Sequence, residues 1–249
     1  MLNFLLCLCY AEIQAAAITY AIGIIGDQAN MGDTSSELQK EYHLRFSTSV
    51  EYRNAVWKIL INDYFGSYIE QNATVLDLGS GWGEFINNIC AGKKYAMDLN
   101  PDGARRINEG VEFLQQDCST EWRIQAASLD VIFTSNFLEH LRTKDALLNT
   151  LAQAQRCLKK DGILICLGPN IKYVKEDYWD FYDHCLPLSH VSLCEALRIR
   201  DCEVISVIPR FPYTMNNGNC PPLLFVRLNL KLPLLWRVFG KQFLITAKK

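Results

Sequence analysis

The stretch Thr74-Val-Leu-Asp-Leu-Gly-Ser-Gly-Trp-Gly83 determines how this chain can fold. It begins with a short, mostly aliphatic run, Thr74–Leu78, which is typical of a strand buried inside a sheet. Glycines follow at positions 79, 81 and 83. Glycine allows tight turns and the close approach of a ligand to the backbone. The stretch therefore predicts a buried strand that ends in a ligand-binding turn.

Further strands and helices are expected to alternate along the chain. The expected strands, in order, are Lys94–Asp98, Val111–Gln115, Leu129–Thr134, Gly162–Gly168, Cys202–Ile208 and Gln242–Ala247. The expected helices are residues 34–70, Glu84–Cys90, Pro101–Asn108, Thr120–Ala127, Lys144–Leu158 and a helix capped by Ser192, with Glu195 completing a capping box. This alternation predicts an α/β fold with a doubly wound, Rossmann-like and mostly parallel sheet.

The composition is that of an ordinary globular protein, with 49% hydrophobic and 21% charged residues. A net charge of -2 gives no overall attraction to nucleic acid, so we expect no nucleic-acid partner. The ten cysteines include no C-x-x-C pair, which favours a reducing, cytoplasmic setting over a disulfide framework. His184, Cys185, His190 and Cys194 match no zinc-binding spacing, so no metal is expected.

Three regions are expected along the chain. Residues 74–249 would form the α/β domain, with an insertion at 210–241, and residues 31–73 a helical annex before it. Residues 1–30 are strongly apolar and would form an N-terminal extension. We expect either that translation begins at Met31, so that the extension is not native, or that the extension is a weak membrane anchor.

Acidic residues at the ends of neighbouring strands indicate the ligand. A dinucleotide site needs glycine at position 84, where this chain has Glu84, whose charge would repel a pyrophosphate. Asp98 ends the second strand and can accept hydrogen bonds from both hydroxyls of a ribose. Asp117 follows the third strand and can reach an adenine edge. A nucleoside ligand with a cationic tail is therefore favoured over NAD.

These features together resemble the class I S-adenosylmethionine-dependent methyltransferases, over a span from Thr74 to about Gly168. The Asp77–Gly83 turn is similar to the family's first motif, and Ser135–Leu141 to a segment of its small-molecule and glycan branches. The resemblance implies a seven-stranded sheet whose last strand is antiparallel, S-adenosyl-L-methionine as cofactor, and methyl transfer as activity. One departure is Asp201, where related chains often carry a turn glycine.

The site residues follow from the motifs and the resemblance. The cofactor-binding residues would be Asp77, Gly79, Ser80, Gly81, Gly83, Asp98, Leu99, Asp117, Cys118 and Asn136. His140 follows the fourth strand and is the candidate catalytic base; its alternative role is to hydrogen-bond the loop. The acceptor-binding residues would be Tyr178, Trp179, Tyr182 and His184. The aromatic segment that contains them would either stack on an acceptor or close as a lid over the cofactor.

The acceptor and partners are expected to be of the following kinds. Related chains with a similar aromatic segment look like those found beside bacterial surface-glycan enzymes, which favours a sugar acceptor. The alternatives are another small molecule, such as a quinone or lipid precursor, or a non-catalytic cofactor-binding protein. Residues 221–240 combine apolar bulk with Arg227, Lys231 and Arg237 and no acid. They would contact the inner face of a membrane, or else pack on the sheet as a helical insertion or form a homodimer contact.

Overall fold

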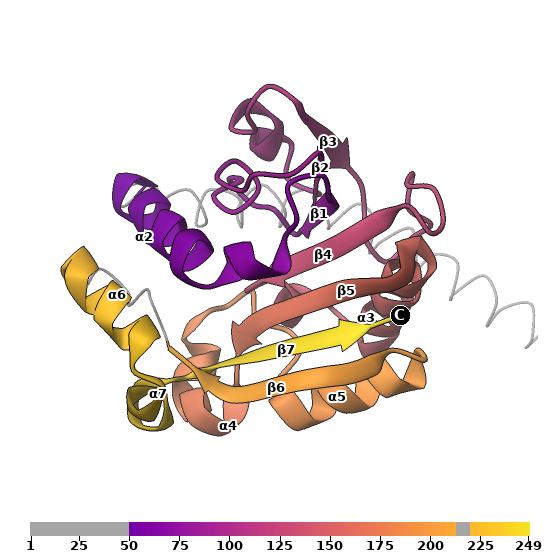
Figure 1. Ribbon diagram of the computed structural model, residues 1–249. Helices are drawn as coiled ribbons and strands as arrows, with labels where there is room; N and C mark the ends of the chain where they lie inside the picture. Colours follow the sequence, from indigo (N-terminus) through magenta and orange to yellow (C-terminus); the bar gives the residue numbers. More distant parts are fainter. Residues whose placement is uncertain (1–49, 213–219) are drawn as a thin grey trace, which may run out of the picture. The chain divides into compact units, whose positions relative to one another are not determined.

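The computed structural model describes residues 50–212 and 220–249 and places a seven-stranded sheet at their centre (Figure 1). The strands are β1 (Thr74–Leu78), β2 (Lys93–Asp98), β3 (Val111–Gln115), β4 (Leu129–Ser135), β5 (Leu158–Pro169), β6 (Glu203–Phe211) and β7 (Gln242–Lys248). Their order is β3-β2-β1-β4-β5-β7-β6, and β7 is antiparallel to both of its neighbours. The expected Rossmann-like sheet with an antiparallel last strand is confirmed.

Helices cover both faces of this sheet. The α-helices are α2 (Val50–Asp63), α3 (Lys144–Cys157), α4 (Ile171–Val174), α5 (His190–Ile199), α6 (Leu223–Lys231) and α7 (Pro233–Phe239). Short 3-10 helices span Phe65–Tyr68, Pro101–Arg105, Leu138–His140 and Lys175–Asp180. One core lies between the sheet and helices α3 and α5, and the other between the sheet and helices α2, α6 and α7. Because side chains alternate along a strand, Leu76 joins the first core and Val75 the second.

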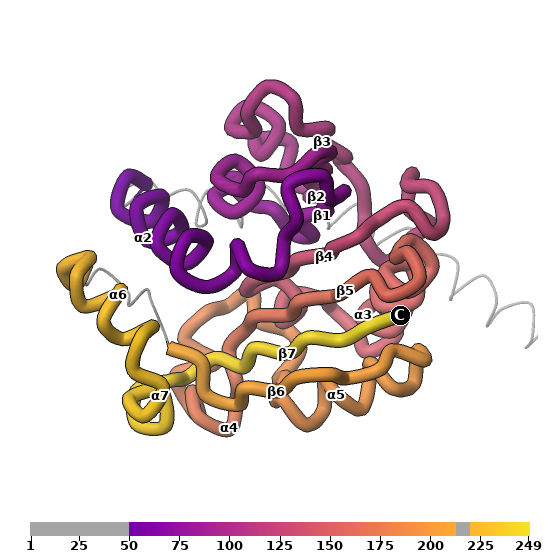
Figure 2. Tube along the Cα trace, in the orientation of Figure 1, coloured from indigo at the N-terminus to yellow at the C-terminus, as the bar shows by residue number. Residues whose placement is uncertain are grey.

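The helix expected at Glu84–Cys90 is wrong, because the structure has a series of turns there (Figure 2). The side-chain amide of Asn88 donates to the carbonyl oxygen of Glu84 at 2.7 Å, and this carbonyl is the one an α-helix would use. The backbone N–H of Asn88 bonds instead to the carbonyl of Phe85. Asparagine side chains that compete for backbone groups in this way favour turns over helix.

Two other helical expectations are corrected. The segment Thr120–Ala127 contains no helix, because the carbonyls of Trp122 and Ile124 accept hydrogen bonds from the guanidinium of Arg156 on α3. The Pro101–Asn108 segment is a 3-10 helix that ends at Arg105. In each case long-range or local side-chain hydrogen bonds satisfy the backbone groups that a helix would have paired.

The cap of α5 lies three residues before the expected one. Ser189 is the N-cap, and the capping box joins its side chain to Ser192, which occupies the third helical position. Asp201, after this helix, has a φ of +55°, which is the left-handed region that glycine favours. Asp201 therefore occupies a turn conformation that related chains often fill with glycine.

The C-terminal insertion packs against the N-terminal side of the described chain. Helix α6 lies beside α2 (Figure 1). The ion pair between Arg227 and Asp63, at 2.8 Å, joins the two helices, and the Tyr52 hydroxyl donates to the carbonyl of Pro221, which precedes α6. Within residues 50–212 and 220–249, no helix has both the length and the hydropathy needed to cross a membrane. Expectations for residues 1–49, including the start at Met31, lie outside the described residues, and the three-region division stays a prediction.

Candidate cofactor and acceptor site

The glycine-rich turn lies where the strand order reverses, since β1 pairs with β2 on one side and β4 on the other. The backbone N–H groups of Gly79 and Ser80 both donate to the carbonyl oxygen of Met97, at 2.9 and 3.1 Å. Gly79, Gly81 and Gly83 have φ values of +71°, +51° and +77°. These values are strained for any residue with a side chain, so the turn requires glycine. Open α/β sheets bind their ligands at such a reversal.

Phe137 gives a second reason for glycine at position 79. A Cβ atom added to Gly79 would lie 2.1 Å from Cγ of Phe137, far inside van der Waals contact. Phe137 follows β4, so its ring holds the β4 loop against the turn after β1. Sequence reasoning missed this residue, because nothing in the motif spacing indicates a packing partner 58 positions away (137 minus 79).

Asp98 connects the glycine turn to the loop after β2. One carboxylate oxygen accepts a hydrogen bond from the backbone N–H of Gly81 and the other from that of Asn100, both at 2.8 Å. Each carboxylate oxygen can accept a second hydrogen bond, so both remain able to bind a ribose hydroxyl. The next residue, Leu99, is 63% exposed and lies at the same strand end.

The electrostatics of the turn favour a cationic ligand. Burial raises the pKa of Asp77 well above its ordinary value, and the negative charges of Glu84 and Asp98 raise it further; a backbone hydrogen bond from Ile86 opposes the rise. Burial also raises the pKa of Asp98. A bound cation would relieve this crowding of carboxylates. The sulfonium and ammonium groups of S-adenosylmethionine carry such charges, so the residues fit this cofactor.

Ser80 supports the same fit. Its hydroxyl oxygen is buried and has no hydrogen-bond partner within the described part of the chain. Buried polar groups are nearly always paired, so an orphaned hydroxyl in a glycine turn indicates a position that a ligand completes.

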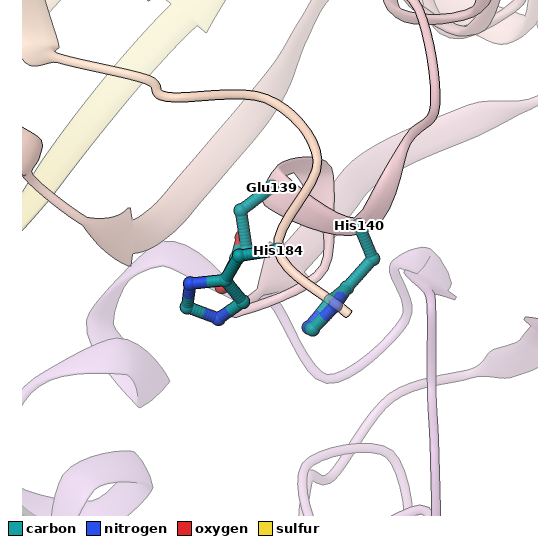
Figure 3. Close-up of side chains that lie close together, drawn as sticks. All are labelled: Glu139, His140 and His184. Carbon is teal, nitrogen blue, oxygen red and sulfur yellow. The ribbon is translucent and has the colours of Figure 1, made fainter. Parts of the chain in front are cut away.

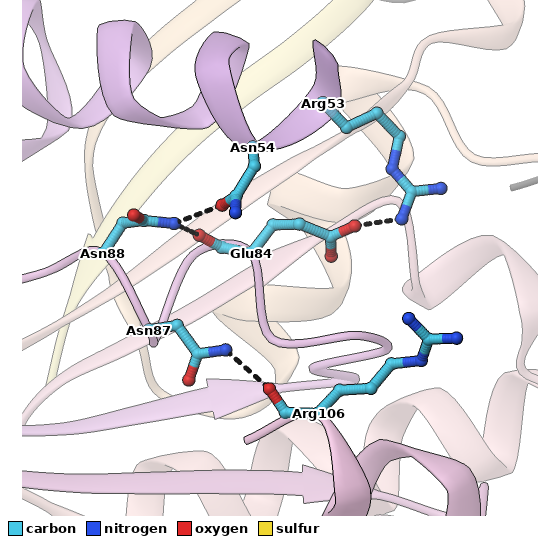
Figure 4. Close-up of polar contacts among 6 residues, drawn as sticks. All are labelled: Arg53, Asn54, Glu84, Asn87, Asn88 and Arg106. Atoms are coloured by element: carbon cyan, nitrogen blue, oxygen red, sulfur yellow. Dashed lines mark hydrogen bonds and ion pairs between the residues drawn. The ribbon is translucent and has the colours of Figure 1, made fainter. Parts of the chain in front are cut away.

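Helix α2 reaches the glycine turn through a buried ion pair (Figure 4). The guanidinium of Arg53 bonds to the carboxylate of Glu84, and the two side chains are 5% and 15% exposed. The Trp82 ring lies near two guanidinium groups, 3.6 Å from that of Arg106 and 4.9 Å from that of Arg53. Glu84 is therefore paired with a cation. Arg53 was not expected in the site, because it lies 31 residues before its partner.

Asp117 and Cys118, the two residues expected on the adenine side, differ in burial. Asp117 is exposed, and one of its carboxylate oxygens accepts hydrogen bonds from the backbone N–H and the hydroxyl of Ser119, both at 2.8 Å. The Cys118 thiol is buried and accepts a hydrogen bond from Thr150 of α3. A cofactor contact at Cys118 would therefore come from its backbone.

Asn136 lies at the end of β4 with a φ of +48°. Its side-chain oxygen accepts a hydrogen bond from the buried Gln242 amide of β7 at 2.7 Å, and its backbone N–H donates to Leu167. These contacts fix the residue between three strands. Asparagine tolerates the left-handed conformation better than most residues, which explains why it can occupy this position.

Glu139, His140 and His184 lie together on the acceptor side (Figure 3). The first two belong to the 3-10 helix after β4. The loop that carries His184 is tied to this helix by hydrogen bonds from the N–H groups of Cys185 and Leu186 to the Glu139 carbonyl, at 2.8 and 2.9 Å. The imidazole rings are 5.1 Å apart between centroids. His140 also lies on the cofactor side, because its 3-10 helix follows β4, which pairs with β1 beside the glycine turn.

The expected acceptor-binding aromatics divide into buried and exposed residues. Tyr178 is fully buried, and its hydroxyl donates to the carbonyl of Leu186, so its ring supports the loop and offers no face to an acceptor. Trp179 and Tyr182 are 55% and 86% exposed, and their rings are accessible for stacking. Trp179 and Tyr182 are therefore the two aromatic residues of this set whose rings an acceptor could reach, and their role in binding stays a prediction.

Comparisons with known proteins agree with this geometry. Residues 49–207 match the family model described as a methyltransferase domain. No curated protein matches the chain in sequence. A SAM-dependent methyltransferase from Archaeoglobus fulgidus is similar in structure, with 19% identity and a TM-score of 0.57, covering 82% of this chain and 99% of that one.

Two further solved structures are similar. One is a chain from the complex of the Haloferax volcanii Trm112 methyltransferase activator with a methyltransferase, with 17% identity, a TM-score of 0.55, and coverage of 80% of this chain and 97% of that one. The other is geranyl diphosphate C-methyltransferase from Streptomyces coelicolor A3(2), in complex with Mg²⁺, geranyl diphosphate and S-adenosyl-L-homocysteine. It has 15% identity and a TM-score of 0.53, covering 77% of each chain.

The family model covers more than half of the chain, and the solved structures share its fold. The enzyme class and the S-adenosylmethionine cofactor expected from the sequence are therefore confirmed, whereas the roles of individual site residues are not tested by these comparisons. This chain belongs to the methyltransferase domain family and is an S-adenosylmethionine-dependent methyltransferase.

Proposed function

We propose that the enzyme transfers a methyl group to a hydroxyl of a small polar acceptor, such as a sugar of a surface glycan or its precursor. The observation that carries this proposal is the placement of a histidine pair and two exposed rings on one loop system beside the cofactor turn. Aromatic rings stack on the apolar faces of sugars, and histidine and carboxylate groups bind their hydroxyls. The bound cofactor would supply the methyl group.

His140 is the residue that we assign to the acceptor's proton. Its Nδ1 atom lies 3.0 Å from the carbonyl oxygen of Asp183, which can only accept, so Nδ1 carries hydrogen and Nε2 has the lone pair. The carboxylate of Asp183 is 3.4 Å from the same Nδ1 and would stabilise the ring after it gains a proton. The remaining acceleration comes from holding the acceptor oxygen in line with the methyl group.

An acceptor screen tests this function. The purified full-length chain is incubated with S-adenosylmethionine and nucleotide sugars, lipid-linked sugars, or quinone and lipid precursors, and S-adenosylhomocysteine release is measured. Turnover with sugars that falls about 100-fold or more in His140→Ala supports the proposal, as expected for loss of a general base. Turnover only with quinone or lipid precursors supports the second candidate. Cofactor binding without turnover on any of these classes would refute the assigned acceptor class.

We further propose that the protein is cytoplasmic and contacts the inner face of the membrane through residues 221–240. Nine side chains of α6, α7 and the residue between them are large, apolar and at least 37% exposed: Leu223, Leu224, Phe225, Leu228, Leu232, Leu234, Leu235, Val238 and Phe239. Within the described residues, the exposed Lys231 and Arg237 have no ion-pair partner. An apolar face bordered by cations is complementary to anionic lipid.

Vesicle sedimentation tests this contact. Wild-type protein is expected to bind phosphatidylglycerol vesicles at low salt, and Leu224→Ser with Phe225→Ser to bind at least several-fold less. The matched control, Val191→Ser with Ile199→Ser, removes similarly exposed apolar residues from α5 and should bind normally. Equal vesicle binding by all three proteins would remove the membrane contact from the proposal. So would a dimer, detected by light scattering, whose interface buries this face.

A further inference from the structure

Both imidazoles of the acceptor side are held in the same protonation pattern. His140 Nδ1 donates to the carbonyl oxygen of Asp183 at 3.0 Å, and His184 Nδ1 donates to that of Tyr178 at 2.8 Å. Each ring therefore has its lone pair on Nε2 when neutral. Histidines that bind metals almost always donate their other ring N–H to a carbonyl or carboxylate, because this fixes the tautomer and the ring orientation.

A buried carboxylate completes the group. Glu139 is only 2% exposed. One potential ligand atom from each of Glu139, His140 and His184 lies within 4.8 Å of the other two (Figure 3). Ligand atoms about 2.0–2.2 Å from a common tetrahedral zinc ion lie roughly 3.3–3.6 Å apart. The three atoms would therefore have to approach one another by up to about 1.5 Å, which side-chain rotations can supply.

We propose that Glu139, His140 and His184 bind one divalent transition-metal ion of the zinc type, and that this ion positions the acceptor hydroxyl. Two imidazoles and one carboxylate form a donor set that suits such ions. The ion would offset the burial of the Glu139 carboxylate. Asp183, 3.4 Å from Nδ1 of His140, supplies the outer carboxylate that commonly supports a metal-binding histidine.

The inference rests on the proposed function and changes the role of His140 within it. Three protein ligands leave a coordination position for the acceptor oxygen. The ion lowers the pKa of the hydroxyl bound there, so its proton passes to water. The oxygen's electron pair then forms the bond to the methyl carbon, the carbon–sulfur bond breaks, and its electron pair stays on sulfur to give neutral S-adenosylhomocysteine. His140 holds the ion in this arrangement and does not accept the proton.

The sequence alone gave no sign of this site. The metal set considered there was built from neighbouring histidines and cysteines around His184 and His190, and it lacked the Glu139–His140 pair. These two residues are brought to His184 by the backbone hydrogen bonds between the loop and the Glu139 carbonyl. His190 lies elsewhere, where its Nδ1 contacts the amide of Asn170 at 2.8 Å.

Metal titration of the full-length protein tests the proposal. Chelator-treated wild type, Glu139→Gln and His184→Gln are titrated with Co²⁺ and Zn²⁺, and the visible Co²⁺ spectrum and the heat of Zn²⁺ binding are recorded. Wild type is expected to bind one equivalent, and each variant to bind at least tenfold more weakly. His190→Gln is the matched control, because it removes a histidine outside the group and should leave binding unchanged. Far-UV circular dichroism and thermal unfolding identify any variant that fails to fold.

The spectrum also separates this site from adventitious binding by thiols. Cys185 is exposed beside His184, so Cys185→Ser is included. Cobalt bound by nitrogen and oxygen alone gives no thiolate charge-transfer band, and that spectrum is the expected result. A strong thiolate band, binding that vanishes in Cys185→Ser but persists in Glu139→Gln, or no stoichiometric binding would each overturn the metal site.

Failure of the metal site and failure of the proposed function give different results. If the protein binds no metal but His140→Ala abolishes methylation of a sugar, the methyl-transfer proposal stands with His140 as a direct base and the metal site is wrong. If metal binds as expected and the protein methylates no hydroxyl acceptor, the metal site stands and the assigned acceptor class is wrong.

Discussion

Replacing Asp98 with asparagine should separate cofactor binding from folding. Asp98 accepts hydrogen bonds from Gly81 and Asn100 and is positioned to accept two more from a ribose. Hydrogen bonds to a charged group contribute about 1.5–3 kcal/mol each, against about 0.5–1.5 kcal/mol for neutral ones. Asparagine keeps one acceptor oxygen without charge, so Asp98→Asn should weaken S-adenosylmethionine binding by about 1.4–3 kcal/mol, or roughly 10- to 150-fold.

The folded protein without cofactor should tolerate the same change. Burial outweighs the hydrogen bonds and raises the pKa of Asp98, so the charged form of this group is less favourable in the folded than in the unfolded state. The gain from losing the buried charge opposes the loss of one of the two backbone hydrogen bonds, since asparagine keeps a single acceptor oxygen, so the thermal unfolding temperature is expected to fall only slightly. Cofactor affinity is measured by calorimetry and unfolding by circular dichroism on the same samples.

A cofactor analogue without ribose hydroxyls identifies the cause. Wild type should bind 2′,3′-dideoxy S-adenosylhomocysteine much more weakly than S-adenosylhomocysteine, whereas Asp98→Asn should discriminate little between them. The difference is the coupling energy between Asp98 and the hydroxyls. If both proteins lose the same factor, Asp98 acts only by holding the Gly81 turn, and the assignment of a ribose-binding role is refuted.

Three other perturbations have defined outcomes. Arg53→Met leaves the Glu84 carboxylate without its cation and should lower the free energy of unfolding, measured in urea titrations, by about 3–5 kcal/mol. Adding Glu84→Gln to the same chain should restore most of this loss. If it restores none, the pairing of the two residues is contradicted. Gly79→Ala places a side chain at a φ of +71° and brings its Cβ atom into collision with Phe137. It should destabilise the protein by at least about 1–3 kcal/mol, measured by thermal unfolding. An unchanged stability would show that the turn is not constrained as described. Because the pKa of Asp77 is raised, the contribution of its protonated form to stability is fully present below its ordinary pKa of 3.8 and is lost as the pH rises through the folded value. Asp77→Asn should therefore gain stability over wild type as the pH rises above about 4. A difference in stability that stays constant across pH would contradict this.

The sheet could be predicted from the sequence because its strands carry local signals. The bounds of β1 and β3 match the expectation, and β2, β4 and β7 differ from it by one residue at one end. Most helices on the β1–β3 side could not be predicted, because asparagine and arginine side chains there take backbone groups that a periodic pattern assigns to helix.

The candidate site was predictable only where it follows a strand end. Asp98 and His140 follow from this rule, since the carboxyl ends of parallel strands share an edge. Arg53, Phe137 and Glu139 act through contacts between distant parts of the chain, and no spacing in the sequence specifies them. The burial of Tyr178 could not be predicted either. Its aromatic side chain suggested stacking on an acceptor, but the loop encloses its ring.

The position of β7 has a consequence for how the protein is made. Strands β5 and β6 pair with β7 and not with each other, so the strand nearest the C-terminus fills the gap between two earlier ones. A nascent chain that has not yet released residues 242–248 from the ribosome presents two unpaired strand edges at the gap. Such edges are templates for association with other chains. The sheet therefore cannot close until residues 242–248 have left the ribosome, and ribosome-stalled chains lacking those residues should depend on chaperones to remain soluble.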